Sequence, residues 1–364
     1  MSAVASTQGR TWTDIEGRQL EASIDGVRDE SVFVIRESDS RRLTLPLNRL
    51  SDEDRVYAQA WAKFEQDLRR PWPSLVRASG VDVEIDTTYD AGIYRYTSPH
   101  FTFQSDAELS TRLVRHIASI FEVVYAAGEE IPLMIEPLPN EQAFSVRLFK
   151  SVKDYEAAGG LHGSVGYYSY DRSEVLVPLS SLAVGDDAGV YRPESNPDYP
   201  VLIHETFHCV TSEWKDFAPI WLVEGFARYM EVLPHTRDQL NFKGLTPRLA
   251  VWKSGGGTYK DVAVLDFEWI LNCSYKQWDR TFYDKPTKLH AQYTSALVLV
   301  LYFVELDGNQ GALFKRYLFE LSQGMPREDA LQILLDGRSH EELSRDIISA
   351  YQRERVSFDI LGLE

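Results

Sequence analysis

Two histidines four residues apart, with a glutamate between them, are the residues of this sequence best suited to chemistry. His204, Glu205 and His208 form a His-Glu-x-x-His pattern inside the apolar segment 200–210. In a helix, residues i and i+4 lie one turn apart on the same face, so both imidazoles can reach one metal ion while Glu205 projects beside it. Imidazole nitrogen is a preferred ligand of Zn²⁺, and the pattern therefore predicts a zinc site on a helix.

A catalytic zinc also needs a third protein ligand and one open position. The downstream segment 221–229 supplies Glu224, far enough from His208 for a turn and a second helix that packs back on the first. Pro219 suits the start of that helix. The small residues Gly225 and Ala227 would let the two helices approach closely.

The His-Glu-x-x-His pattern followed by Glu224-Gly225-x-Ala227 resembles the gluzincin metallopeptidases, particularly their peptidase MA-like branch, loosely over residues 92–350. The resemblance implies that His204, His208 and Glu224 hold Zn²⁺. It also implies that Glu205 is the general base that takes a proton from water and returns it to the leaving amine.

The same resemblance implies an oxyanion-stabilising tyrosine on a later helix. Tyr293 is the candidate, and His290, one turn away, is a second candidate catalytic residue. Both residue types are also typical of the edge of a core, and the tyrosine-rich segment 166–170 is a rival source of a hydrogen-bond donor.

Two departures from related enzymes narrow the prediction. Nothing before His204 resembles the Gly-x-Met-Glu-Asn segment of the aminopeptidase gluzincins, which favours an endopeptidase. Thermolysin-like enzymes place an aspartate four residues after the third ligand to orient a histidine, but this sequence has Arg228 at that position. Glu231 lies on the same helical face as Glu224 and could substitute, although a solvated surface carboxylate is the favoured interpretation.

A peptide or protein substrate is expected to lie extended along an edge strand, for which the segment 175–179 is the candidate. Two other functions use the same residues. One is a gluzincin scaffold with little or no catalysis that serves as a peptide- or protein-binding module, and the other is a zinc amidase acting on a non-peptide amide.

Residues 11–67 read as a separate module. Leu20–Ile24 and Val32–Ile35 alternate apolar and polar residues, as short strands do, and Ser51 caps a helix whose first turn is acidic. The Trp12 and Gly17 positions and the segment 45–54 resemble the Sla-homology domain, a small SH3-like barrel. The resemblance implies a docking site for a peptide or protein partner, and a structural cap without a ligand is the alternative.

The prolines at 71 and 73 mark the boundary of this module. The predicted domains are a Sla-homology SH3-like module at 1–68, a linker at 69–80 and a gluzincin metallopeptidase-like domain at 81–364. The predicted fold class is α+β: a small N-terminal SH3-like β-barrel is followed by a zincin-like domain with a β-sheet and a mostly helical C-terminal part.

Composition limits the partners. The chain has 364 residues, 44% of them apolar, and a formal net charge of −17, which disfavours nucleic acid because no basic patch is present. The longest apolar run, 296–304, predicts no membrane span. Residues 1–10 lack the apolar core of a signal peptide, but a leader could have preceded them, so the compartment stays open. Cys209 and Cys273 are expected to be buried free thiols, with a single disulfide as the alternative.

Overall fold

The computed structural model describes residues 9–78, 80, 82–90, 92–135, 143–194, 199–243, 262–282, 285–308 and 311–363. The chain has mixed α and β structure and divides into two compact units. The first unit comprises Met1–Pro71, Pro132–Met134 and Tyr302–Asp346. The second comprises Trp72–Ile131, Ile135–Leu301 and Ile347–Glu364.

The first unit begins with an antiparallel sheet of four strands in chain order: β1 (Arg10–Thr13), β2 (Gln19–Arg28), β3 (Ser31–Arg36) and β4 (Arg42–Pro46). The predicted strands Leu20–Ile24 and Val32–Ile35 are confirmed within β2 and β3. Their alternating apolar residues form one buried face, which includes Ala22, Ile24, Val32 and Val34. The sheet fits a small barrel-like domain, but no barrel closes among the described strands.

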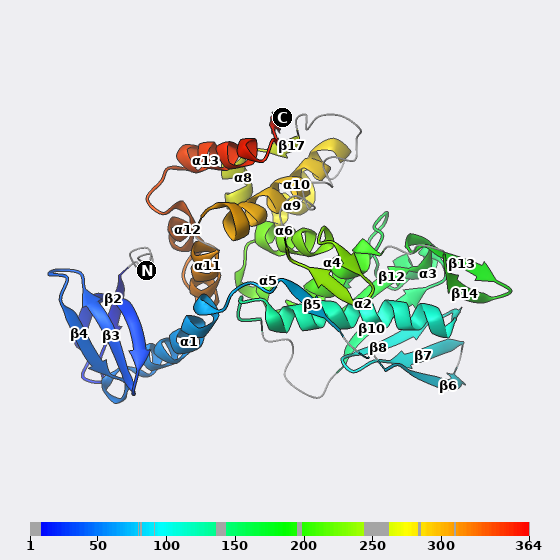
Figure 1. The fold of residues 1–364 in the computed structure, drawn as a ribbon, viewed down its shortest axis with the longest axis horizontal. Helices are drawn as coiled ribbons and strands as arrows, with labels where there is room; N and C mark the ends of the chain where they lie inside the picture. The colour runs from blue at the N-terminus through cyan, green and yellow to red at the C-terminus, as the bar shows by residue number, and fades with distance from the viewer. Residues whose placement is uncertain are drawn as a thin grey trace. The chain divides into compact units, whose positions relative to one another are not determined.

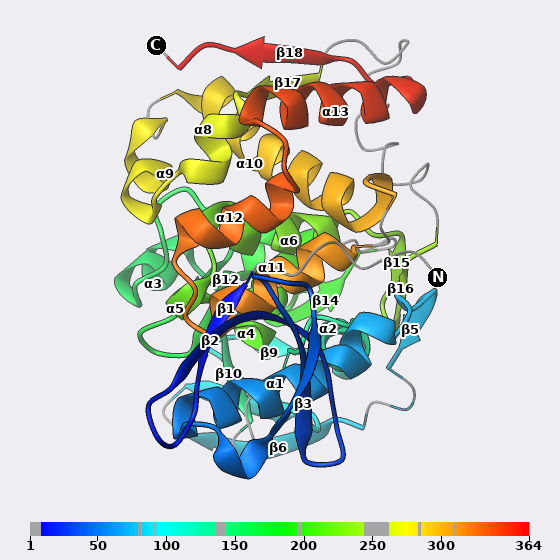
Figure 2. The ribbon, with the colours of Figure 1, turned by 90° about the vertical axis from the view of Figure 1, so that its left-hand side faces the viewer.

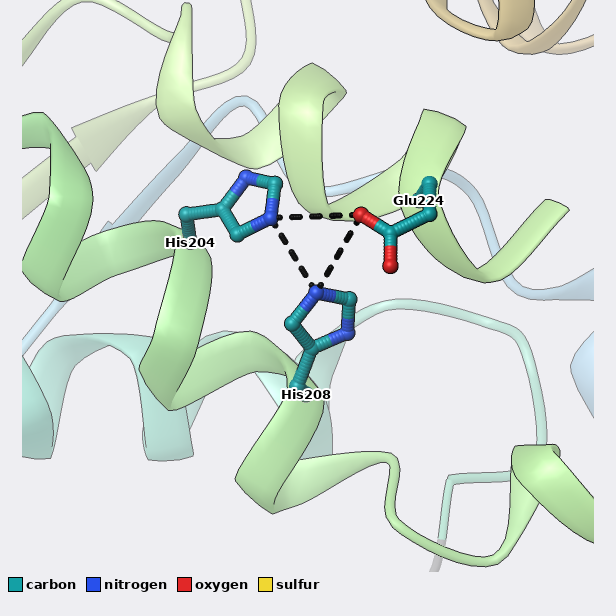
Figure 3. Close-up of side chains that lie close together, drawn as sticks. All are labelled: His204, His208 and Glu224. Carbon is teal, nitrogen blue, oxygen red and sulfur yellow. Dashed lines mark hydrogen bonds and ion pairs between the residues drawn. The ribbon is translucent and has the colours of Figure 1, made fainter. Parts of the chain in front are cut away.

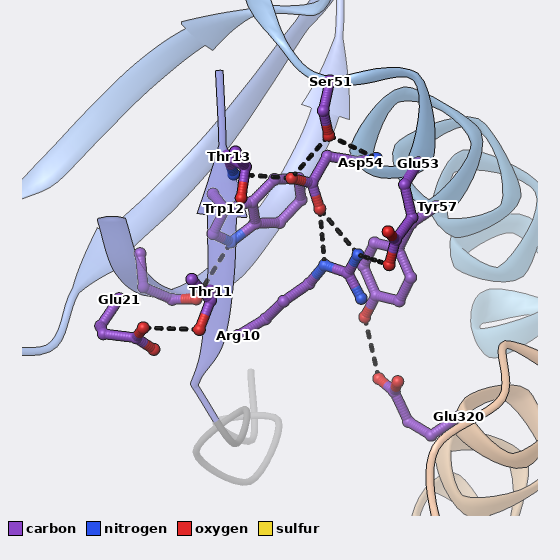
Figure 4. A network of polar contacts seen from close by, with 11 residues as sticks. Arg10, Thr11, Trp12, Thr13, Glu21, Ser51, Glu53, Asp54, Tyr57 and Glu320 are labelled. Carbon is purple, nitrogen blue, oxygen red and sulfur yellow. Dashed lines mark hydrogen bonds and ion pairs between the residues drawn. The ribbon is translucent and has the colours of Figure 1, made fainter. Parts of the chain in front are cut away.

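Helix α1 (Asp52–Arg69) packs against this sheet (Figure 2). The predicted cap is confirmed, because the Ser51 hydroxyl accepts a hydrogen bond from the Asp54 backbone amide at 3.2 Å. Asp54 also ties the helix to β1: its carboxylate accepts from Arg10 Nε at 2.9 Å and from the Thr13 amide at 2.6 Å (Figure 4). These contacts fix β1 to the first turn of α1.

The first unit is completed by chain that lies far away in sequence, in α11 (Ala312–Ser322) and α12 (Arg327–Leu335). Phe319 of α11 is fully buried, with its ring centroid 4.5 Å from that of Phe64 and 5.3 Å from that of Trp61. Next to it, Glu320 accepts a hydrogen bond from the Tyr57 hydroxyl at 2.9 Å (Figure 4). The aromatic face of α1 therefore packs on α11.

The second unit is built on a mixed sheet of six strands, in the order β11-β12-β10-β8-β7-β6. Strands β8, β10 and β12 are parallel to one another, and the other pairs are antiparallel. The strands are β6 (Glu84–Asp90), β7 (Ile93–Thr97), β8 (Phe101–Ser105), β10 (Phe144–Phe149), β11 (Tyr167–Ser169) and β12 (Glu174–Pro178).

Helix α2 (Thr111–Glu130) lies along this sheet (Figure 1). Phe121 of α2 packs edge-on against Phe101 and Phe103 of β8, with centroids 5.0 and 5.3 Å apart. The same helix packs against α4 (Pro200–Val210), so it joins the sheet to the His-Glu-x-x-His segment. Short helix α3 (Val152–Ala157) packs on β10 and β12.

The remaining helices are α5 (Trp214–Phe217), α6 (Ile220–Glu231), α8 (Phe267–Asn272), α9 (Tyr275–Thr281), α10 (Pro286–Leu301) and α13 (His340–Arg353). Three small sheets contain β5 (Leu75–Arg77), β9 (Glu108–Leu109), β13 (Val184–Asp187), β14 (Val190–Pro193), β15 (His235–Thr236), β16 (Gln239–Asn241), β17 (Val262–Leu265) and β18 (Phe358–Leu361).

Within the part of the chain that the structure describes, one segment has the length and apolar composition of a membrane span. It runs over Pro286–Leu306, and its most apolar stretch is 72% buried inside the protein. Core helices of globular proteins share this composition, so the segment is weak evidence for a membrane.

Candidate metal centre

The predicted helix over 200–210 is confirmed as α4, with Pro200 in its first turn. Most of the helix is buried, including Leu202, Ile203 and Phe207, because α2 packs on one side of it and α6 on another. His204 and His208 lie one turn apart on this buried helix. The packing of α2 and α6 against α4 fixes the backbone from which both imidazoles project.

Helix α6 places Glu224 opposite the two histidines. The helix begins directly after Pro219, and the Phe226 ring stacks on Phe207 of α4 with centroids 5.1 Å apart. This aromatic contact packs α6 back on α4, as the spacing predicts. Gly225 was expected to let α6 approach α4, but its close approach is to α10. A Cβ on Gly225 would lie 2.6 Å from the carbonyl oxygen of Ala296 in α10. Gly225 is thus required where α6 meets α10.

The side chains of His204, His208 and Glu224 converge (Figure 3). The two Nε2 atoms lie 3.1 Å apart, and Glu224 Oε2 lies 3.5 Å from His204 Nε2 and 3.6 Å from His208 Nε2. Two ligands about 2.0–2.1 Å from a tetrahedral zinc ion are about 3.4 Å apart. The separations of 3.5 and 3.6 Å are close to this value and the separation of 3.1 Å is shorter, so the three side chains could hold one ion, and the donor set of two imidazoles and one carboxylate is one that catalytic zinc sites use.

The cluster contains three side chains that could hold a metal ion, and among the described residues no fourth histidine, cysteine or acidic side chain joins it. Structural zinc sites usually have four protein ligands, whereas catalytic sites leave one position open. Cys209 and Cys273 are both buried free thiols, as predicted, and neither belongs to the cluster.

Burial and mutual charge set the protonation of the cluster. Burial lowers the pKa of His204, but hydrogen bonds with Glu224 and Glu231 outweigh this and raise the pKa to about 10. Burial also raises the pKa of Glu224, yet the two imidazoles hold this pKa well below its ordinary value. The charged forms of His204 and Glu224 therefore favour each other.

Glu205 projects beside the cluster from the same helix and is buried. Burial raises the pKa of its carboxyl group, although the neighbouring imidazoles act in the opposite direction. The segment that enters β11 lies directly against it: a Cβ on Gly166 would lie 3.0 Å from Glu205 Cγ and 2.9 Å from Val201 Cγ2. Glycine at position 166 therefore lets the end of the sheet reach the candidate base.

Of the other candidate catalytic residues, Tyr293 lies near the cluster. It is on α10, and the charge of Glu224 is the main cause that raises its pKa, followed by burial. The Trp278 ring packs edge-on against it, with centroids 5.2 Å apart. His290 on the same helix has an exposed side chain, and within the described residues none of its hydrogen bonds or ion pairs reaches the cluster. The structure thus brings Tyr293 toward the site and leaves His290 outside it.

The tyrosine-rich segment contributes one contact. The Tyr170 hydroxyl lies 3.5 Å from His208 Nδ1, the ring nitrogen that faces away from the cluster. Burial raises the pKa of Tyr170 well above its ordinary value, so this hydroxyl stays protonated. The contact was not predicted, since no sequence spacing relates residues 170 and 208.

Two predictions about neighbouring elements are wrong. Glu231 is not a solvated surface carboxylate: its side chain is 17% exposed, and Oε2 lies 3.0 Å from His204 Nδ1. The segment 175–179 is not at an edge, because β12 pairs with β10 on one side and with β11 on the other. Among the described strands, the edge next to β12 is formed by β11, which packs against α4.

No protein-family model, curated protein sequence or solved structure matches the chain. The gluzincin and Sla-homology resemblances therefore rest on the residues quoted for them, and both stay predictions.

Proposed function

We propose that this protein is a zinc-dependent hydrolase of peptide bonds, with His204, His208 and Glu224 as zinc ligands and Glu205 as general base. The observation that supports the proposal is the convergence of the three ligand atoms, whose separations of 3.1, 3.5 and 3.6 Å lie within about 0.3 Å of the value for a tetrahedral zinc. The same observation supports Zn²⁺ as the cofactor, because three ligands leave one coordination position for chemistry.

Zinc supplies a Lewis acid that polarises a carbonyl and lowers the pKa of water from 15.7 toward about 7. Glu205 is buried one residue from a ligand, where its carboxylate accepts the proton that an attacking water loses. It then donates that proton to the leaving nitrogen, so that the amine departs uncharged. General-base catalysis of this kind accelerates a reaction typically 10²- to 10⁴-fold.

Tyr293 is the proposed donor to the oxyanion that forms when water adds to the carbonyl. A donor must keep its proton at the working pH, and both the charge of Glu224 and burial raise the pKa of Tyr293. Tyr170 is a poorer candidate because its hydroxyl contacts the outer nitrogen of His208.

We propose that the substrate binds along β11, the edge strand next to β12, instead of along 175–179. Strand β11 pairs only with β12 among the described strands, and a peptide could extend the sheet along its other side. Because Gly166 brings the start of this strand against Glu205, the backbone of such a peptide would pass the candidate base. An extended substrate that needs no free amine fits the proposed endopeptidase activity.

The N-terminal unit remains a proposed docking module for a peptide or protein partner. The four-stranded sheet and α1 fit a small barrel-like domain, which is the coarser part of the Sla-homology expectation.

The test uses the full chain and its Glu205→Gln variant, which keeps the size of the side chain and removes its basicity. We expect both proteins to bind one zinc ion per chain by elemental analysis. The wild type should digest unfolded casein until a chelator is added. The variant should digest it about 10²- to 10⁴-fold more slowly.

Each other outcome selects an alternative. Zinc in both proteins without cleavage of casein or of a peptide library would indicate a binding scaffold. Cleavage confined to non-peptide amides would indicate an amidase. If His204→Ala left the zinc content of the protein unchanged, the assignment of the site would be wrong.

A further inference from the structure

The outer nitrogens of the two histidines meet different partners. His204 Nδ1 lies 3.0 Å from a carboxylate oxygen of Glu231, whereas His208 Nδ1 lies 3.5 Å from the Tyr170 hydroxyl. The first separation is that of a good hydrogen bond and the second is at the limit for a weak one. The two candidate ligands are therefore held unequally.

Glu231 is itself fixed by a neighbour on α6. Arg228 Nη1 lies 2.5 Å from Glu231 Oε1, so one carboxylate oxygen binds the guanidinium while the other faces His204. Glu224, Arg228 and Glu231 are spaced i, i+4 and i+7 and share one face of the helix. One helical face thus carries a zinc ligand and the pair that holds a second ligand from behind.

A carboxylate accepts hydrogen bonds and does not donate them, so its contact with Nδ1 requires the proton of a neutral imidazole to be on Nδ1. The lone pair of that imidazole is then on Nε2, which points to the centre of the cluster. A tyrosine hydroxyl can either donate or accept, so Tyr170 does not impose one tautomer on His208.

We propose that Glu231, held by Arg228, is a positioning residue that sets the tautomer and ring orientation of His204 for metal binding, and that Tyr170, which contacts His208 within the described residues, gives no equivalent support. This inference rests on the proposed function, since it concerns the same zinc site. Carboxylates behind metal-binding histidines typically change metal affinity 10- to 100-fold.

The experiment measures the zinc dissociation constant of the full chain by competition with a chromophoric chelator. We expect Glu231→Ala to weaken zinc binding about 10- to 100-fold, and Glu231→Gln to weaken it less because the amide oxygen still accepts from Nδ1. Arg228→Met should produce a smaller loss than Glu231→Ala. The comparison variant Tyr170→Phe should change the constant by less than about threefold, as expected for a weak contact.

Thermal unfolding of each metal-free variant shows whether it is folded. If a folded Glu231→Ala variant binds zinc as tightly as the wild type, or if Tyr170→Phe is as damaging as Glu231→Ala, the inference is overturned. Both results leave the proposed function intact as long as the wild type binds zinc and cleaves casein. If the wild type binds no zinc, the proposed function itself fails.

Discussion

Tyr293 is the single residue whose substitution would test the proposed stabilisation of the oxyanion. Its hydroxyl is kept protonated by the charge of Glu224 and by burial, both of which raise its pKa. A phenol in this state can donate a hydrogen bond to a developing oxyanion throughout the neutral range. The same surroundings would make Tyr293 a poor general base, so the role proposed for it differs from that proposed for Glu205.

Tyr293→Phe should therefore lower kcat about 10²- to 10³-fold, as the loss of one oxyanion donor does, with zinc content unchanged. KM should change little, because the hydrogen bond forms in the transition state. Steady-state kinetics on a peptide substrate measure both constants. Tyr170→Phe is the matched comparison, and a larger loss of kcat in Tyr170→Phe than in Tyr293→Phe would transfer the role to Tyr170.

At the scale of elements, the positions along α4 were predictable and the surroundings of the site were not. The helical repeat alone brings His204 and His208 to one face, and a turn between helices brings back Glu224. The contact of Glu231 depends on the rotation of α6 against α4, and the edge position of β11 depends on strand order. Neither is encoded in local spacing, which explains why both were predicted wrongly.

Substitution of Gly225 would test the packing of α6 against α10, which places Glu224. A methyl group at this position would lie 2.6 Å from the Ala296 carbonyl oxygen and 3.0 Å from Val300 Cγ2, so α6 and α10 would have to move apart. Alanine has the higher helix propensity, by about 1 kcal/mol, but a clash with backbone is not relieved by a side-chain rotation. Gly225→Ala should lower the free energy of unfolding by about 1–3 kcal/mol.

Thermal unfolding measures this loss, and Gly185→Ala is the control, since a Cβ on Gly185 meets nothing within 4 Å. Displacement of α6 also moves Glu224, so zinc affinity should fall in Gly225→Ala and not in Gly185→Ala. Equal stability of the Gly225→Ala variant and the wild type would contradict the described contact between α6 and α10.

For the whole molecule, sequence patterns do not reveal every segment that belongs to the first unit. Residues 302–346 belong to the same compact unit as the N-terminal sheet. Lys315 and Phe319 of α11 make this connection, and both are buried. No period or motif marks a lysine and a phenylalanine as partners of a helix that lies some 250 positions earlier, so only the tertiary structure shows it.

Lys315 gives this connection a measurable pH dependence. Its Nζ donates to the carbonyl oxygens of Asp67 and Arg70 at the end of α1, at 3.1 and 3.0 Å, and burial lowers its pKa to about 8. In the unfolded chain a lysine titrates near pH 10.4, so between about pH 8 and 10.4 the unfolded chain binds more protons than the folded one. Stability should therefore rise with pH in this window.

We expect the free energy of unfolding of the wild type to gain about 1–2 kcal/mol between pH 7.5 and pH 10 relative to Lys315→Met. This is less than the full pKa shift implies, because the carbonyl acceptors also stabilise the charged ammonium. Denaturant titrations at the two pH values give the difference, and Lys276→Met, at an exposed position, serves as control. If the wild type and Lys315→Met respond equally to pH, the buried ammonium is not where the structure places it.

X-ray absorption at the zinc edge of the loaded protein tests whether two imidazoles and one carboxylate hold a zinc ion with one position open. We expect four nitrogen and oxygen neighbours at about 2.0–2.2 Å, two of them imidazoles, and no sulfur. In His208→Ala the imidazole contribution should fall by half or the zinc should be lost. A sulfur neighbour at about 2.3 Å, or a shell without imidazole, would rule out His204, His208 and Glu224 as the zinc ligands.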